Sequence, residues 1–344
     1  MPINSVALLK QQFQAALRTG GKVGTAAAET LISSVKADGV TNSERRQLRE
    51  QLIANEDRFE PAAAARLHDF IDNQIPALLV DDPVVSTTAG GTDLPDPALP
   101  DKDRATVHYD WTSGSMFKAG AEAGDVVQGM LGDCYVMSAF AAVAAQAPEK
   151  IKEALTDNGN GTYTARFYDV TAQPAKRVEV TIDGQLPTRN GGLQYGKGAD
   201  RSELWVGLLE KAYSQWKGGY DVVGKGGSAG DVMTALTGNS GGQLPLTPGD
   251  EKDIHQLLMV SIQGGHSMVA ATHGEDQDAM YRGTGIYADH GYTVLGAEES
   301  GGKLLVTLRN PWGEVEPSGN GKDDGVFKLE MTEFLKLYDT LFIC

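Results

Sequence analysis

The chain has 344 residues, of which 41% are hydrophobic and 22% charged, as is typical of a globular protein with room for two or three domains. Its net charge of −16 argues against nucleic acid as the main partner, because phosphate binding needs clustered lysine and arginine. No apolar run approaches the roughly 18 residues that span a bilayer, and the first residues do not resemble a signal peptide, so we expect a cytoplasmic protein with no membrane span.

Residues 1–80 are predicted to form a helical domain. Leucine, isoleucine and phenylalanine recur there at three- and four-residue spacing, and Thr41–Glu44 has the sequence of a capping box. Asp38 and Gly39 invite comparison with a calcium-binding helix-loop-helix, but in that register position twelve is Arg45 instead of glutamate. The segment holds nine basic and nine acidic residues, which fits a neutral helical appendage, and we interpret it as a candidate prosegment.

Residues 81–106 are predicted to be a flexible linker. They lack hydrophobic periodicity and are rich in proline, glycine, aspartate and threonine. A segment of this kind is accessible to proteases, and an enzyme that cuts itself would be expected to cut here.

Beyond the linker the chain mixes helices and strands. The alanine-rich stretch that begins at Cys134 is predicted to be a buried helix, and residues 202–216 an amphipathic one. Residues 161–170 and 176–184 alternate in the way that strands do. The last part of the chain is predicted to contain strands at residues 257–263, 266–272, 291–299, 303–310, 326–331 and 341–344.

Cys134 is one of only two cysteines, the other being Cys344, and it stands at the first turn of the predicted buried helix. Unpaired N–H groups and the helix dipole at that end favour thiolate over thiol, which makes a sulfur nucleophilic. Asp133 is expected to cap the helix, and Gly132 to let the chain turn sharply into it. A lone cysteine in such a helix also fits a plain core residue, and this interpretation stays open on the pattern alone.

A cysteine nucleophile needs a base and a group that orients the base. Among six histidines, His290 stands out because it lies in an acidic, glycine-containing turn that leads into a predicted strand. A second predicted strand ends at Asn310, and two neighbouring antiparallel strands would hold both side chains together. An asparagine carbonyl that accepts the imidazole N–H would fix the ring without adding charge.

Five blocks of the sequence, all in family order, resemble the protease core of the calpains, within the papain-like cysteine proteases. They are QGMLGDCY, ELWVGLLEKAYSQWKGGYDVV, HGYTVL, LRNPWGEVE and FLKLYDTLFIC, between about residues 107 and 344. The resemblance implies a catalytic set made of the nucleophile Cys134, the base His290, the orienting Asn310, the oxyanion-hole side chain Gln128 and the covering Trp312.

The resemblance also implies an α+β, papain-like fold of two lobes with an N-terminal helical extension. Lobe one is expected over residues 107–245 and lobe two over residues 246–344. Calpains usually have tryptophan after the nucleophile and glycine before the histidine, where this chain has Tyr135 and Asp289. The charge of Asp289 is expected to raise the pKa of His290. Because the chain ends with the protease core, we expect a minimal form without the C-terminal calpain domains.

The chemistry of such a protease requires no cofactor, but the resemblance implies one calcium ion in each lobe. The residues that match ligand positions are Gly120, Asp125 and Glu203 in lobe one, and Glu316 with Asp323 or Asp324 in lobe two. The family has an arginine where this chain has Ala123, and it pairs there with an acid of the other lobe. We therefore expect weak calcium binding at Asp125 and Glu203, and catalysis that depends on calcium less strictly than in animal calpains.

The sequence thus predicts a calpain-like cysteine endopeptidase that acts on proteins or peptides through an acyl-thioester, with its N-terminal region as a candidate restraint. Two alternatives stay open for the site: a papain-like acyl transferase or deamidase with the same triad, and a pseudoprotease that binds peptide without cutting it. A dimerising or partner-binding role is the alternative for residues 1–80. The oligomeric state does not follow from the sequence.

Overall fold

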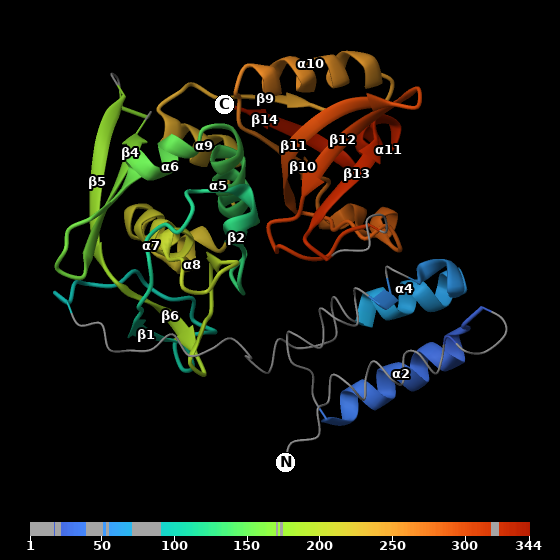
Figure 1. Ribbon diagram of the computed structural model, residues 1–344, viewed down its shortest axis with the longest axis horizontal. Coiled ribbons are helices and arrows are strands. Elements are labelled where there is room, and N and C mark those ends of the chain that lie inside the picture. The colour runs from blue at the N-terminus through green and yellow to red at the C-terminus, as the bar shows by residue number, and fades with distance from the viewer. Residues whose placement is uncertain are drawn as a thin grey trace.

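A computed structural model describes residues 17, 22–38, 51–52, 55–70, 91–169, 171–172, 175–317 and 323–344. These residues form a mixed helix and sheet structure of two lobes, preceded by a small helical unit (Figure 1). None of the helices in these ranges is long and apolar enough to cross a membrane.

The helical unit has a hydrophobic core of its own. Its described elements are α2 (Thr25–Asp38), the 3-10 helix η1 (Glu56–Arg58) and α4 (Pro61–Asp69). Its buried side chains include Ala28, Leu31, Ile32, Phe59, Leu67 and Phe70. A single parallel bridge joins Val23 to Phe59. The predicted capping box at Thr41–Glu44 lies outside the described residues.

Lobe one is built around the buried helix α5 (Cys134–Gln146), which starts at the residue where the sequence predicts it. The other helices are η3 (Ala123–Asp125), α6 (Pro148–Ala154), α7 (Trp205–Lys217), α8 (Tyr220–Val223) and α9 (Ala229–Thr237). The strands are β1 (His108–Trp111), β2 (Val126–Val127), β3 (Leu155–Asp157), β4 (Thr162–Asp169), β5 (Lys176–Asp183), β6 (Gln185–Arg189), β7 (Gly192–Leu193) and β8 (Lys197–Gly198). They pair as β3-β4-β5, β1-β6-β7 and β2-β8.

Lobe two is a six-stranded antiparallel sheet in the order β13-β12-β11-β10-β14-β9. Its strands are β9 (Gly242–Pro245), β10 (Met268–Thr272), β11 (Gly291–Ser300), β12 (Lys303–Arg309), β13 (Val326–Glu330) and β14 (Tyr338–Ile343). Its helices are α10 (Glu251–Gln263), η4 (Glu275–Tyr281) and α11 (Met331–Leu337). Strand β9 pairs with β14, so it belongs to this sheet although it precedes the predicted boundary at residue 246.

The strand predicted over residues 257–263 is wrong, because this stretch is the second half of helix α10. Ile254, Leu258 and Ser261 are buried at helical spacing, and Val260 on the opposite side is exposed. The acidic residues Glu251 and Asp253 stand in the first turn, where they favour a helix. A short apolar run does not distinguish a strand from one half of an amphipathic helix.

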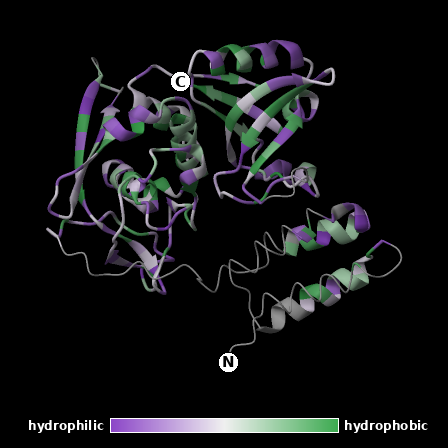
Figure 2. Ribbon diagram, in the orientation of Figure 1, coloured by the Kyte–Doolittle hydropathy of each residue, from purple (hydrophilic) through white to green (hydrophobic). Residues whose placement is uncertain are grey.

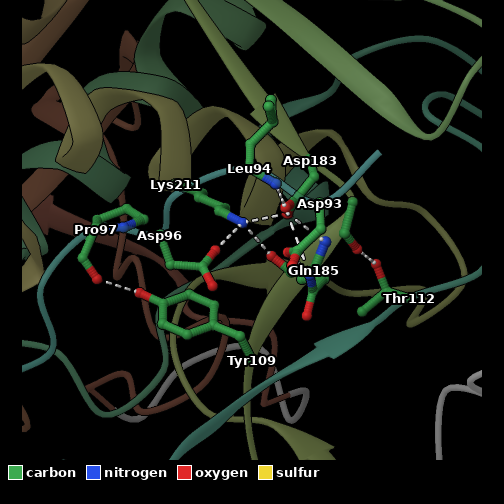
Figure 3. Close-up of polar contacts among 10 residues, drawn as sticks. Asp93, Leu94, Asp96, Pro97, Tyr109, Thr112, Asp183, Gln185 and Lys211 are labelled. Atoms are coloured by element: carbon green, nitrogen blue, oxygen red, sulfur yellow. Dashed lines mark hydrogen bonds and ion pairs between the residues drawn. The ribbon is translucent and has the colours of Figure 1, made fainter. Parts of the chain in front are cut away.

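The linker prediction also needs correction over residues 91–106, because much of this segment is held against lobe one (Figure 3). The ammonium group of Lys211, which is 1% exposed, lies 2.5 Å from the carboxylate of Asp96 and 2.6 Å from that of Asp183. The main-chain N–H of Leu94 donates to Asp183 at 2.7 Å. Asp96 in this proline-rich segment thus joins an ion-pair network around a buried lysine, which composition alone does not distinguish from a mobile linker.

The two lobes meet along α5, which is hydrophobic over most of its length (Figures 1 and 2). Ser138 on this helix donates its hydroxyl to the carbonyl of Gly291 on β11 at 2.7 Å. The hydroxyl of Thr293 donates back to the carbonyl of Ser138 at 2.8 Å. These buried bonds hold the first two turns of α5 against the first residues of β11.

Candidate active site

Cys134 is the first residue of α5, and the approach to it is fixed by close main-chain contacts. A side chain on Gly132 would place its Cβ 2.7 Å from the carbonyl oxygen of Gly224, so only glycine fits there. Asp133 occupies the N-cap position, but its side chain makes no capping hydrogen bond, contrary to the prediction. Its carboxyl group is fully buried near Glu210 instead.

Burial raises the pKa of the Cys134 thiol to about 11, and the charges of Asp133 and Asp289 act in the same direction. The main-chain N–H of Gly291 stabilises the thiolate but does not outweigh these effects. The expectation that the helix N-terminus makes Cys134 a thiolate near neutral pH is therefore wrong for the free protein. Cys134 lies beside Gly291, the residue that directly follows His290, because a Cβ on Gly291 would lie 3.7 Å from the carbonyl oxygen of Cys134.

A buried pair of acids lies behind the cysteine, and the sequence analysis missed it. Burial raises the pKa of Asp133 to about 7. Burial and the charge of Asp133 together raise the pKa of Glu210 well above its ordinary value. Glu210 also accepts the N–H of Gly196 at 3.0 Å. Two neighbouring buried carboxyls do not both ionise readily, so the pair retains a proton near neutral pH.

His290 is held at the start of β11 through its main chain. Its N–H donates to the hydroxyl of Thr272 at 2.9 Å, and the same hydroxyl donates to the carbonyl of Tyr287 at 2.7 Å. The preceding residue, Asp289, has φ 49, in the left-handed region that favours glycine. This conformation accounts for the glycine that calpains usually carry there, and aspartate is one of the residues that tolerate it.

The structure brings His290 and Asn310 together from neighbouring strands, with the imidazole Nε2 3.0 Å from Asn310 Oδ1. The orientation of the amide follows from its other partners. Its Oδ1 also accepts the N–H of Trp312 at 3.2 Å, and its Nδ2 donates to the carbonyl of Val315 at 3.0 Å. Because Oδ1 accepts, Nε2 carries the hydrogen, and Nδ1 is the nitrogen free to take a proton.

Burial lowers the pKa of His290 to about 4, although its hydrogen bond with Asn310 acts in the opposite direction. The expectation that Asp289 raises this pKa is wrong, since its charge acts on Cys134 and burial dominates at the imidazole. The indole of Trp312 lies 4.7 Å from the imidazole between ring centroids, as the covering role requires. The ring of Tyr287 lies 4.7 Å from the indole, a neighbour that no sequence signal indicated.

Gln128 lies on lobe one but is tied to the segment that follows Asn310. Its main-chain N–H donates to the carbonyl of Pro311 at 2.8 Å. Its side-chain Nε2 donates to the carbonyl of Leu131 at 2.7 Å, which uses one of the two amide hydrogens. The side chain of Gln128 also interacts with the buried carboxyl of Asp133 and lowers its pKa, so a bound oxyanion would share the second amide hydrogen with that carboxyl.

The residues suggested for calcium in lobe one are already engaged by protein groups. Asp125 Oδ2 accepts the main-chain N–H of Glu122 at 2.8 Å, and Glu203 Oε1 accepts that of Lys118 at 2.7 Å. Burial raises the pKa of Glu203, and the charge of Asp125 adds to this effect. A Cβ on Gly120 would lie 3.2 Å from the ammonium nitrogen of a lysine, Lys152.

In lobe two, Glu316 is the residue that fits a cation best. It is 2% exposed, and neither carboxylate oxygen accepts a well-formed hydrogen bond among the described residues, although the main-chain N–H groups of Asp324 and Gly325 act to lower its pKa. Burial, with the charges of Asp324 and Asp323, raises its pKa to about 8. Asp323 accepts the N–H of Val315 at 2.7 Å, so it also supports the loop behind Asn310. In the described part of the chain, no three His, Cys, Asp or Glu side chains group to hold a metal ion.

Comparison with known proteins gives a family for these residues. The profile of the calpain family cysteine proteases matches residues 106–323. The chain is 30% identical to the calpain-2 catalytic subunit of Homo sapiens, over 65% of this chain and 36% of that protein. It is 29% identical to calpain-9 of Rattus norvegicus over the same shares, and 32% identical to the calpain-type cysteine protease ADL1 of Oryza sativa subsp. japonica over 64% and 10%. The chain thus spans about a third of the length of the first two relatives.

Proposed function

Because the chain belongs to the calpain family of cysteine proteases, with its two-lobed papain-like fold, we propose that it is an endopeptidase with Cys134 as nucleophile. The observation that carries this proposal is the buried contact between His290 and Asn310, at 3.0 Å, beside the first turn of α5. Its substrates are proteins or peptides.

The reaction starts from a neutral thiol and a neutral imidazole, in keeping with the directions in which burial shifts the two pKa values. Nδ1 of His290 takes the thiol proton as the sulfur attacks the scissile carbonyl carbon and a tetrahedral oxyanion forms. The C–N bond then breaks, the imidazolium gives its proton to the leaving amine, and an acyl-thioester remains on Cys134. His290 next deprotonates a water molecule, which attacks the thioester and releases the acid and the thiol.

The Asn310 carbonyl stabilises the imidazolium that forms in both steps, because its oxygen accepts the Nε2 hydrogen throughout. Gln128 stabilises the oxyanion with its second amide hydrogen, together with the main-chain N–H of Cys134, and one such donor is worth about 10²–10³ in rate. Trp312 excludes water from the His290–Asn310 contact, which strengthens that bond.

The test is proteolysis of casein by four proteins: wild type, Cys134→Ser, His290→Ala and Cys344→Ser. Cys344 is buried and its sulfur lies 3.1 Å from the hydroxyl of Thr237, so its serine variant is a control for the loss of a thiol elsewhere. We expect cleavage by wild type and Cys344→Ser, and almost none by the other two. Substantial cleavage by Cys134→Ser would refute the mechanism. Glutamine deamidation without chain cleavage, read by mass spectrometry, would assign the site to the deamidases instead.

We further propose that the N-terminal helical unit restrains the protease. Its support is a close approach: a Cβ on Gly283, in the loop between η4 and His290, would lie 4.0 Å from the Cβ of Ala65 on α4. A chain that begins at Gly91 keeps the segment that pairs with Lys211, and it is expected to be at least as active as the full chain. Lower activity per folded molecule would leave a partner-binding or dimerising role as the better account.

Calcium would supply no chemistry to this reaction, but it would compensate buried carboxylate charge. We propose that Glu316, with Asp323 or Asp324, holds it in lobe two, and that Asp125 and Glu203 hold it only weakly in lobe one. Calorimetry of wild type, Glu316→Gln and Asp125→Asn measures both sites separately. Heat of binding that survives in Glu316→Gln but not in Asp125→Asn would reverse the assignment.

A further inference from the structure

A short seam of hydrogen bonds joins the two lobes directly behind the candidate active site. The guanidinium Nη2 of Arg309, at the end of β12, donates to the carbonyl of Val126 on β2 at 2.7 Å. It also reaches the carbonyl of Gly124 at 3.4 Å. In the opposite direction, the N–H of Gln128 donates to the carbonyl of Pro311 at 2.8 Å. Residues 309–311 of lobe two are thus joined to residues 124–128 of lobe one.

Arg309 is an unusual residue for this position. It is 2% exposed, so its charge is withdrawn from water, and the acids Asp324 and Asp125 face it from the two lobes. Burying a guanidinium is unfavourable unless its hydrogen bonds compensate. The bonds that Nη2 makes go to main-chain oxygens of the other lobe, whereas Nη1 has no hydrogen-bond partner among the described residues. A hydrophobic side chain would fill the same space without this cost, so a side chain chosen for packing alone would not be arginine.

The seam lies between two groups that must act together on one substrate. Asn310, which orients His290, stands between Arg309 and Pro311. On the other lobe, Gln128 is the oxyanion donor and precedes Cys134 by six residues. A shift of one lobe along the seam would move the imidazole relative to the sulfur and the amide. Misplacement of about 1 Å is enough to cost roughly a hundredfold in rate.

We propose that Arg309 is a positioning residue that holds lobe two in catalytic register with lobe one through the carbonyls of Val126 and Gly124. The inference rests on the proposed function, since register matters only if the two lobes share one reaction. Both partners in each bond are protein groups, so the register set by Arg309 does not require a bound cation.

The experiment compares Arg309→Met, Arg309→Lys and the control Arg104→Met in the full-length protein. Arg104 donates to the carbonyl of Leu99 and pairs with Asp101 at 2.9 Å, both within its own segment. Activity on a fluorogenic peptide is measured in chelator and in calcium. Hydrogen exchange is measured on peptides that cover residues 126–131, where Gln128 donates across the seam, and residues 162–183 as a reference.

We expect Arg309→Met to lose about 10–100-fold in kcat, with a smaller change in KM, and Arg309→Lys to recover most of the loss because its ammonium also donates to Val126. Exchange in residues 126–131 should accelerate in Arg309→Met while residues 162–183 keep the wild-type rate. Wild-type exchange in residues 126–131, or equal activity of Arg309→Met and Arg104→Met, would overturn the proposal. If exchange rises in both regions, the residue is merely structural and the proposal also fails.

These outcomes are separable from a failure of the proposed function. If wild type cleaves nothing, or if Cys134→Ser cleaves as well as wild type, the proposed protease mechanism fails. The exchange measurement still decides whether Arg309 holds the seam, because it does not depend on turnover.

Discussion

Replacement of Asn310 by alanine tests how much of catalysis depends on the orientation of His290. The side chain is fully buried and makes three hydrogen bonds, with the imidazole Nε2 at 3.0 Å, the N–H of Trp312 at 3.2 Å and the carbonyl of Val315 at 3.0 Å. Two of these partners, the imidazole and the Val315 carbonyl, lie in the interior. Each costs about 1–3 kcal/mol when left unsatisfied, so the free energy of unfolding should fall by roughly 2–6 kcal/mol.

The catalytic loss should be smaller than that of removing the nucleophile. Only the imidazole bond acts on the reaction, and a loss of about 1.4–2.8 kcal/mol of transition-state stabilisation lowers kcat/KM about 10–100-fold. The residual activity comes from imidazole rings that still reach the correct orientation part of the time.

The assay is kcat/KM on a fluorogenic peptide together with the midpoint of thermal unfolding, for Asn310→Ala and for Asn158→Ala. Asn158 makes hydrogen bonds to the hydroxyls of Thr162 and Thr164 in lobe one, far along the chain from the site, so it controls for the loss of an asparagine. Full kcat/KM in Asn310→Ala would refute the orienting role. A variant as inactive as Cys134→Ser, at temperatures where it is folded, would show that the contact does more than orient the ring.

Three further predictions follow from the described contacts. Because burial lowers the pKa of His290 from 6.5 to about 4, the folded protein should be about 3 kcal/mol more stable above pH 6.5 than below pH 4. For the same reason kcat/KM should decline on the acid side near pH 4, and a decline centred near pH 6.5 would contradict this. Asp96→Ala should lower the free energy of chemical unfolding by roughly 1–3 kcal/mol, because the buried ammonium group of Lys211 then keeps only one of its two carboxylate partners, Asp183. Unchanged stability would show that residues 91–106 are not anchored by this ion pair. Iodoacetamide should label Cys134 before the more buried Cys344, with a rate that still rises above pH 9, and a plateau below pH 8 would indicate a preformed thiolate.

Sequence reasoning located the elements whose pattern is long or bounded by a strong signal. Helix α5 begins at Cys134 as expected, and the strands that carry His290 and Asn310 at their ends are neighbours in one sheet. The resemblance added Gln128 and Trp312, both of which lie near this contact. Periodicity was sufficient for the helix and strands that carry Cys134, His290 and Asn310, because local structure decides where these elements begin and end, whereas Gln128 and Trp312 came from the resemblance alone.

The features that escaped prediction depend on partners far away in the sequence. Proline-rich composition did not reveal that Asp96 pairs with Lys211, and a buried Arg309 at a strand end has no local signal at all. The predicted direction of the Cys134 pKa shift was wrong because a helix terminus is only one influence on the thiol, and burial depends on everything packed around it. Residues 257–263 were assigned to a strand because their apolar run fits either element.

The central claim is that a peptide bond is broken through a thioester on Cys134, and trapping that species tests it directly. Wild type is mixed with an excess of a peptide ester, quenched in acid within the first turnover and mapped by mass spectrometry, with His290→Ala treated in parallel. The account predicts an acyl group on Cys134 in wild type, none on Cys344, and little or none in His290→Ala. Rapid turnover with no acyl group on Cys134 would contradict it.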